Sequence, residues 1–234
     1  YAEQVAVPSQ MLMPIPDDWN FEQAAAIPEV FLTAFVNLFM EAGLQPGETV
    51  LIHGGASGVG TAAIQLASRA GCPMFVTAGS DEKVARCLEL GAEWGVNYRR
   101  EDFAEVIRAR AGGGVDVILD MVGADYFERN LQLLNLRGRL VFIALLSGGS
   151  VSFNLGALLG RRLRLIGSVL RSRSVAEKVA IKEAFMARFW PDLLNGTIQP
   201  IIDSVYSIEQ AAEAHRRMAA NLNVGKIVLT VRQG

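Results

Sequence analysis

The chain has 234 residues, of which 51% are hydrophobic and 20% charged, so it is long enough to bury a sizeable core. A formal net charge of −2 excludes the broad basic field that nucleic acid or an anionic membrane surface would require. The two cysteines, Cys72 and Cys87, form neither a disulfide framework nor a CxxC metal knuckle. This usage indicates a reducing, cytoplasmic compartment.

The first part of the chain carries no targeting signal by pattern. Residues 1–15 lack the basic start and apolar centre of a signal peptide, and we expect no membrane span from the apolar runs. Residues 1–19 begin without Met and alternate like a strand inside a sheet, so we expect a trimmed chain. Asn20 predicts the start of a short helix that Pro28 closes, and a helix over 31–42 follows, ended by Gly43.

From Thr49 onward, short apolar runs alternate with amphipathic segments. The predicted strands are 49–54, 73–78, 94–97, 115–120, 139–145 and 164–170, and the helices between them are 58–70, 81–90, 101–111 and 125–136. Strands that are apolar on both faces are typical of a parallel sheet covered by helices. The sequence therefore predicts an α/β fold with a doubly wound, parallel Rossmann sheet.

The C-terminal part leaves this pattern. A predicted helix over 175–194 is followed by "QPIIDSVYS", a helix over 208–220 and a last strand, "GKIVLTV". This tail is more similar to the opening of the chain than to its middle. We therefore expect the two ends to belong to a second, incomplete β-rich domain.

The glycine-rich turn after the first strand is the main candidate for ligand binding. The segment Gly55-Ala56-Ser57-Gly58-Val59-Gly60 follows a predicted strand and opens a predicted helix, although Ser57 replaces the second glycine of a strict GxGxxG pattern. In this context glycines let the backbone approach a pyrophosphate at the helix N-terminus. The alternative is a tight corner without a ligand.

The end of the second predicted strand discriminates between the nicotinamide cofactors. Enzymes that prefer NAD place an acidic residue there, whereas this chain has Gly79 and Ser80. Lys83, one helical turn later, offers a cation for a 2′-phosphate. We therefore predict NADPH, against the alternative that Lys83 is an ordinary solvated lysine.

Several segments together resemble a known family. They are "AAAIPEVFLTAF", "GETVLIHGGASGVGTAAIQLA", "GSDEK", "GAEWGVNYR", "GVDVILDMVG" and "AHRRMAANLNVGKIVL". In this order they resemble the zinc-independent quinone oxidoreductases of the medium-chain dehydrogenase/reductase superfamily, the branch that includes zeta-crystallin. The resemblance implies a remnant of a GroES-like catalytic domain over 1–24, a Rossmann domain over 25–200 and a return to the catalytic domain over 201–234, with most of the N-terminal domain missing.

The resemblance also implies the roles of individual residues. It places Thr33 beside the nicotinamide, Ala56 to Val59 at the pyrophosphate, Ser80, Lys83 and Tyr98 at the 2′-phosphate, and Val122 at the ribose. The implied walls around the nicotinamide are Phe142, Ile143, Ala144, Ser168 and Leu170. Asn223, near the C-terminus, is implied to reach back to the cofactor. For three of these the alternative is structural: Thr33 caps or packs within its helix, Tyr98 is an edge-strand aromatic residue, and Phe142 belongs to the core.

The residues themselves argue against a metal centre. The two histidines, His53 and His215, and the two cysteines form no three-ligand catalytic zinc site. We predict instead that His53 ends a strand and that His215 packs or caps on the apolar face of the helix 208–220, with Met218 and Leu222. No catalytic residue is identified. We expect hydride transfer from NADPH to a quinone, with a 2-enoyl thioester or enone reductase, or a non-enzymatic NADPH-binding protein, as alternatives. The resemblance further implies a homodimer through strand 164–170, and we expect this partial chain to be inactive alone.

Overall fold

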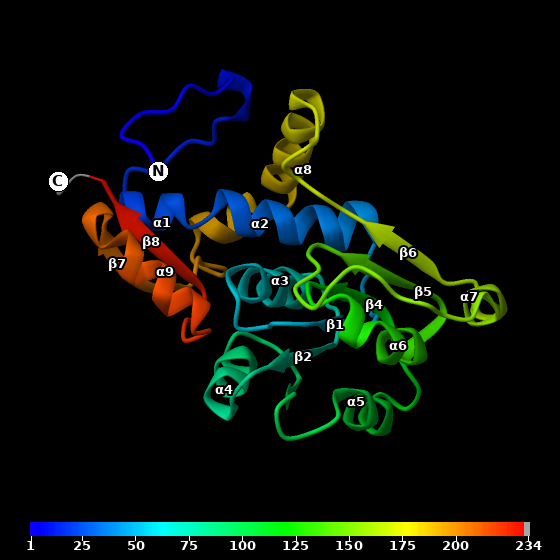
Figure 1. Ribbon diagram of the computed structural model, residues 1–234. Coiled ribbons are helices and arrows are strands. Elements are labelled where there is room, and N and C mark those ends of the chain that lie inside the picture. Colours follow the sequence, from blue (N-terminus) through cyan, green and yellow to red (C-terminus); the bar gives the residue numbers. More distant parts are fainter. Residues whose placement is uncertain (232–234) are drawn as a thin grey trace.

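A six-stranded parallel sheet forms the centre of the protein in a computed structural model that describes residues 1–231 (Figure 1). The strands lie in the order β3-β2-β1-β4-β5-β6. Their bounds are β1 (Val50–Ile52), β2 (Met74–Ala78), β3 (Trp94–Asn97), β4 (Val115–Asp120), β5 (Leu134–Phe142) and β6 (Arg164–Gly167). The chain order reverses between β1 and β4, which is the topology of a doubly wound Rossmann sheet. The predicted fold class is confirmed.

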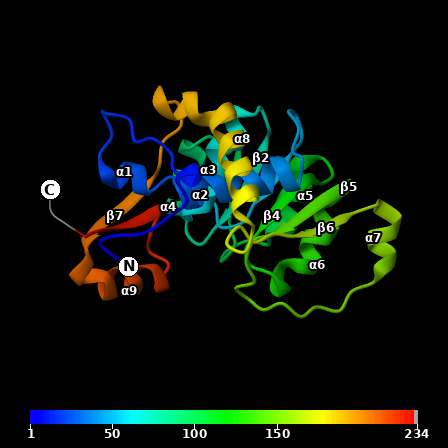
Figure 2. The same ribbon diagram turned by 90° about the horizontal axis from the view of Figure 1, so that it is seen from above.

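Helices cover both faces of the sheet because alternate strand residues point to opposite sides. In β1, Val50 and Ile52 belong to one core cluster and Leu51 to the other. The helices that pack on the first cluster are α2 (Pro28–Phe35), α3 (Gly58–Arg69), α4 (Asp81–Glu89) and α8 (Val175–Leu194). Those on the second are α5 (Phe103–Ala111), α6 (Ala124–Leu133) and α7 (Leu155–Arg161). Figure 2 shows α8 on the far side of the sheet from α6 and α7.

The N-terminal helices differ from the expectation at their boundaries. Asn20 caps α1 (Phe21–Ala25) as predicted, but Pro28 opens α2 rather than closing the helix before it, as suits a residue without a backbone N–H. After α2 the chain forms a π-helical turn, η2 (Val36–Glu41). The amide of Asn37 donates to the Thr33 carbonyl at 2.7 Å and so competes for a helical acceptor, which accompanies the wider backbone pattern.

One further expectation about the first 41 residues is wrong, and another stays untested. Residues 1–19 contain no strand, only a 3₁₀ turn, η1 (Ser9–Met11). By length and composition alone the segment Phe21–Glu41 is long and apolar enough to cross a membrane, but half of its most apolar window is buried, so the expectation of no membrane span stays a prediction. Its central helix α2 packs against α3 and α8, as a core helix of a globular domain does.

The second half of the sheet also shifts from the prediction. Helix α6 ends at Leu133 and β5 follows immediately, so the predicted helix 125–136 is too long and the strand 139–145 starts too late. Arg137 lies within β5 at φ 64°, a conformation rare for a side chain with Cβ, and this irregularity hid the strand. Strand β6 ends at Gly167, not at residue 170. Helix α7 was not predicted.

The C-terminal segment forms a small separate sheet. Strands β7 (Ile202–Ser207) and β8 (Lys226–Thr230) pair in parallel, with the 3₁₀ turn η3 (Ile208–Gln210) and helix α9 (Ala211–Ala219) between them. A bridge between Ser57 and Gly225 joins this sheet to the glycine turn. The assignment of 1–24 and 201–234 to a catalytic domain stays a prediction.

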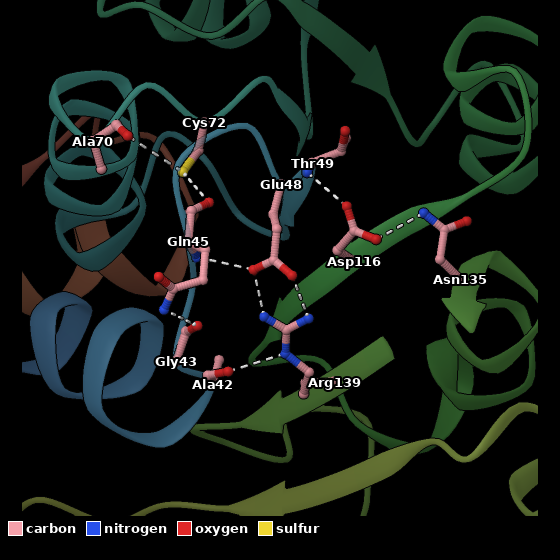
Figure 3. Close-up of polar contacts among 10 residues, drawn as sticks. All are labelled: Ala42, Gly43, Gln45, Glu48, Thr49, Ala70, Cys72, Asp116, Asn135 and Arg139. Carbon is pink, nitrogen blue, oxygen red and sulfur yellow. Dashed lines mark hydrogen bonds and ion pairs between the residues drawn. The ribbon is translucent and has the colours of Figure 1, made fainter. Parts of the chain in front are cut away.

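The amino edge of the large sheet is tied together by polar contacts (Figure 3). Arg139 in β5 donates to both carboxylate oxygens of Glu48 at 2.9 and 2.6 Å, and its Nε donates to the Ala42 carbonyl. On β4, Asp116 accepts from the Thr49 N–H and the Asn135 amide, each at 2.9 Å. These contacts join the loop before β1 to the starts of β4 and β5, on the opposite edge from the cleft described next.

Candidate functional site

A cleft of about 1040 Å³ lies at the carboxyl edge of the sheet, where the strand order reverses. This is the position where open α/β sheets bind ligands. Twelve of the sixteen predicted cofactor-binding residues line it: Thr33, Ala56, Ser57, Gly58, Val59, Gly79, Lys83, Tyr98, Val122, Ile143, Ala144 and Asn223. Segments far apart in the sequence are thus brought together as expected, while the binding role of each residue stays a prediction.

The glycine turn connects β1 to α3 and is built for close approach. Gly54 adopts φ 61°, and a Cβ on Gly60 would lie 2.3 Å from the Gly54 carbonyl oxygen, so only glycine allows α3 to pack on the strand end. The Ser57 hydroxyl caps α3 by accepting from the Gly60 N–H at 3.0 Å. Within residues 1–231 no acceptor contacts the N–H groups of Gly58 and Val59. These two donors at a helix N-terminus form a site for an anion.

The corner after β2 is uncharged on the strand and cationic beside it. The Tyr98 hydroxyl lies 2.8 Å from where a Cβ on Gly79 would stand, so the phenol covers this glycine. Lys83 Nζ donates to the carbonyl and the side-chain oxygen of Asn221 at 2.7 and 3.0 Å. An ammonium has three donors, so one remains for a ligand in the cleft. Burial lowers the pKa of Lys83, as expected for a cation at a cleft wall.

Ser80 has a different position from the one its predicted role suggests. Its hydroxyl caps α4 by accepting from the Lys83 N–H at 3.3 Å, and it does not line the cleft. It therefore holds the first turn of α4, from which Lys83 extends. Its contact with a phosphate stays a prediction.

A second cavity of about 610 Å³ adjoins the cleft. Thr33 and Ile143 line both, and Ser168 and Leu170 line the second alone. Its lining is mostly apolar, with Leu32 and Val169 among its walls. The positions predicted to surround the nicotinamide thus divide between the cleft and this cavity.

Phe142 lines neither space. Its ring is stacked on Phe127 at 6.1 Å between centroids and packs with the second core cluster. This position agrees with the structural alternative for Phe142. A direct contact with the cofactor stays a prediction.

The two histidines have unrelated surroundings. His53 is fully buried just after β1, where it bonds Thr77 and Asn130, and burial lowers its pKa to about 4. His215 is exposed and lies 2.6 Å from the Tyr1 hydroxyl. Met218 in α9 and Leu222 just after it are 58% and 59% exposed, so the expected packing of this face is wrong.

Several residues that line the cleft were not predicted, among them Tyr126 and Asn221. Tyr126 lies in the first turn of α6, the helix that follows the end of β4, so the position of strand ends at this edge of the sheet could have indicated it. Lys226 forms a 2.8 Å ion pair with Glu29 and lies over the glycine turn, 2.7 Å from where a Cβ on Gly58 would stand.

Fold and cleft together define a dinucleotide-binding domain of the Rossmann class. A profile of the family described as "Zinc-binding dehydrogenase" matches residues 58–185. Quinone oxidoreductase of Mus musculus is 31% identical over 98% of this chain and 69% of its own length. Quinone oxidoreductase of Thermus thermophilus, solved also with NADPH, superposes with a TM-score of 0.87 at 33% identity, over 98% of this chain and 73% of that one. The enoyl reductase CurK gives 0.80 at 32% identity, over 93% and 65%.

The chain therefore belongs to the zinc-binding dehydrogenase family, within the medium-chain dehydrogenase/reductase superfamily of oxidoreductases. It spans about two thirds of the length of these relatives. The family description names zinc, yet residues 1–231 hold no group of three or more His, Cys, Asp or Glu side chains that could bind a metal ion. This part of the chain does not fit a zinc site, and we assign no step to one.

Proposed function

We propose that the chain is the NADPH-binding part of a zinc-independent oxidoreductase that transfers reducing equivalents from NADPH to a quinone. The observation that carries the proposal is the corner at Gly79. It has no acidic side chain to repel a 2′-phosphate, and Lys83 is held beside it with one donor free. Similarity to quinone oxidoreductases of mouse and Thermus thermophilus supports the choice of acceptor.

The residues assign distinct tasks to the two spaces. The N–H groups at the start of α3 bind the pyrophosphate, Lys83 binds the 2′-phosphate, and Tyr98 closes the adenosine end. Thr33 and Ile143 stand where the cleft meets the second cavity and orient the nicotinamide toward it. NADPH supplies the hydride when bound. The mostly apolar second cavity positions a flat quinone.

The test of the cofactor is a pair of titrations, with NADPH and with NADH, followed by fluorescence. We expect Lys83→Ala to raise the NADPH Kd about tenfold, the loss of one charged hydrogen bond, and to leave the NADH Kd within about twofold. The control is Arg86→Ala on the same helix, whose guanidinium pairs with Glu89 away from the cleft. An unchanged ratio of the two Kd values in Lys83→Ala would refute the 2′-phosphate site.

A second candidate is a 2-enoyl thioester reductase. It is favoured by the similarity to the enoyl reductase CurK. Both candidates use the same cofactor site, so the test is NADPH oxidation with a quinone or with a 2-enoyl thioester. Turnover of the thioester alone would replace the first proposal, and tight NADPH binding without turnover of either would support a non-enzymatic, crystallin-like role.

We also propose that the protein is cytoplasmic and forms a homodimer through strand 164–170. In residues 1–231, β6 pairs with β5 on one side only, so it is an edge strand of the large sheet. An exposed edge is stabilised by pairing with a second copy. Light scattering on the purified chain tests this, and a monomer at micromolar concentration would contradict it.

A further inference from the structure

A chain of buried polar side chains lies beneath the cleft and reaches it at both ends. His53 Nδ1 bonds the Thr77 hydroxyl at 2.9 Å, and His53 Nε2 bonds Asn130 Oδ1 at 2.8 Å. Asn130 Nδ2 donates to Asp120 Oδ2 at 3.3 Å. His53, Asn130 and Asp120 are fully buried and Thr77 is 1% exposed. Apolar residues would satisfy these core positions without polar groups to bury, so this chain needs an explanation.

The direction of every hydrogen bond in the chain is fixed. An ionised carboxylate only accepts, so the amide of Asn130 turns its NH₂ toward Asp120 and its oxygen toward His53. Nε2 of His53 must then carry the ring proton. His53 is neutral at pH 7 because burial lowers its pKa to about 4, so bare Nδ1 accepts from the Thr77 hydroxyl.

At the Asp120 end, this hydrogen-bonded chain of side chains fixes a loop of the cleft wall. Asp120 ends β4, and its carboxylate accepts from the N–H groups of Val122 and Gly123 at 2.6 and 3.2 Å. Gly123 has φ 91° and ψ −127°, a conformation that residues other than glycine rarely adopt. The carboxylate therefore stabilises an unusual backbone path through the segment Met121–Gly123.

Residues at the two ends of this hydrogen-bonded chain of side chains line the cleft, and the residues in its middle do not. Thr77, Met121 and Val122 line the cleft, whereas His53 and Asn130 do not. The Met121–Gly123 loop in turn holds the next one, because the Ser147 N–H and hydroxyl both donate to the Val122 carbonyl at 2.8 Å. A continuous path thus runs from the end of β2 to the loop after β5.

We propose that Asp120, Asn130 and His53 are positioning residues for the cofactor, which set the shape of the Met121–Gly123 loop and lock it to Thr77 across the cleft. The inference rests on the proposed NADPH site. It assigns a role to the buried histidine without any contact between His53 and the ligand.

The experiment uses Asp120→Asn to reverse the direction of the hydrogen bonds among the buried side chains. The new NH₂ faces Asn130, whose amide must turn over, so that Nε2 of His53 accepts and the ring proton moves to Nδ1. With ¹⁵N-labelled histidine, NMR then shows a change of tautomer at His53, with His215, the second of two histidines, as internal reference. The introduced NH₂ takes the place of the carboxylate oxygen that accepted from the Gly123 N–H, so this N–H loses its acceptor. We therefore expect the loop to shift and the NADPH Kd to rise about tenfold.

The matched control is Asp116→Asn on the same strand. Asp116 also bonds an asparagine and a backbone N–H, but at the amino edge, away from the cleft. We expect its NADPH Kd to stay within about twofold of the wild-type value. Equal effects of the two variants on the Kd would overturn the proposal, as would an Nδ1–H or charged His53 in the wild type at pH 7.

A second pair of variants applies if Asp120→Asn does not fold. His53→Leu removes both bonds and should raise the NADPH Kd, whereas His53→Gln, which offers a donor and an acceptor, should restore it. Wild-type affinity in both variants would reject the positioning role while the NADPH site stands. Absence of NADPH binding by the wild type would reject the proposed function and the role with it.

Discussion

The two edges of the central sheet each carry a network of acidic and amide side chains, and β4 contributes an aspartate to both. At the amino edge, Asp116 is half-buried, and next to it Glu48 and Arg139 pair directly (Figure 3). At the carboxyl edge, Asp120 is fully buried and meets a neutral histidine chain and two backbone N–H groups. At the amino edge, Glu48 and Arg139 neutralise each other and Asp116 accepts from a backbone N–H and an amide, so this network serves stability. The second holds an uncompensated charge beneath a cleft, which is the arrangement expected at a functional site.

The largest expected effect comes from the glycine turn at the carboxyl edge. A Cβ on Gly60 would stand 2.3 and 2.6 Å from the carbonyl oxygens of Gly54 and Gly55, so Gly60→Ala must separate α3 from the end of β1. We expect a loss of about 3 kcal/mol or more in the free energy of unfolding, measured by urea denaturation, together with loss of NADPH binding.

The control for this substitution is Gly160→Ala. Gly160 lies in the exposed helix α7, and nothing stands within 4 Å of its added Cβ, so alanine should be neutral or stabilise by up to about 1 kcal/mol. If Gly60→Ala were as stable as Gly160→Ala, the close approach at the turn would be refuted.

The next largest effect is the pH dependence of stability at the carboxyl edge, where two buried groups titrate. Burial raises the pKa of Asp120 to about 6 from 3.8, so its stabilising contribution is present below about pH 4 and is lost as pH rises through 6. Burial, together with the charge of Arg129, lowers the pKa of His53 from 6.5 to about 4, so its contribution is present above pH 6.5 and is lost as pH falls through 4. The two contributions have opposite signs and nearly cancel between pH 4 and 6.5.

Replacing either Asp120 or His53 should leave the pH dependence of the other residue visible in the stability of the protein. In Asp120→Asn we expect stability to rise relative to wild type by about 3 kcal/mol between pH 4 and 6.5, and in His53→Gln to fall by a similar amount. Urea denaturation at pH 4.5, 5.5 and 6.5 measures both slopes. Parallel profiles for the wild type and the two variants would show that the buried pair does not titrate in this range.

The features that could be predicted from the sequence are those whose interacting residues lie close together along the chain. The glycine turn, the corner at Gly79 and Lys83, and helix 175–194 rest on neighbouring residues, and all were located correctly. The buried chain was not predicted, because His53 meets Thr77 and Asn130 across 24 and 77 residues. Only the sheet order brings these positions together. Helix α7 was not predicted because Gly156 and Gly160 lower its helix propensity and none of its residues is buried, so no apolar periodicity marks it.

The smallest expected effect is at the amino edge. Burial raises the pKa of Glu48, but the hydrogen bonds from Arg139 and the Gln45 N–H outweigh it, so the net pKa is lowered. Its contribution is therefore present above pH 4.5 and is lost as pH falls through the lowered value. Glu48→Gln keeps the shape and removes the charge, leaving the Arg139 guanidinium, whose side chain is 12% exposed, without its counter-ion. We expect a loss of about 1–2 kcal/mol at pH 7 by urea denaturation.

The same variant decides whether the edges are independent. Glu48 lies on the opposite side of the sheet from the cleft, so its loss should leave the NADPH Kd within about twofold, as for Asp116→Asn. Asp120→Asn should instead raise the NADPH Kd about tenfold. If Glu48→Gln weakened NADPH binding as much as Asp120→Asn did, the cleft would depend on the rigidity of the whole sheet, and the carboxyl-edge chain would have no special part in it.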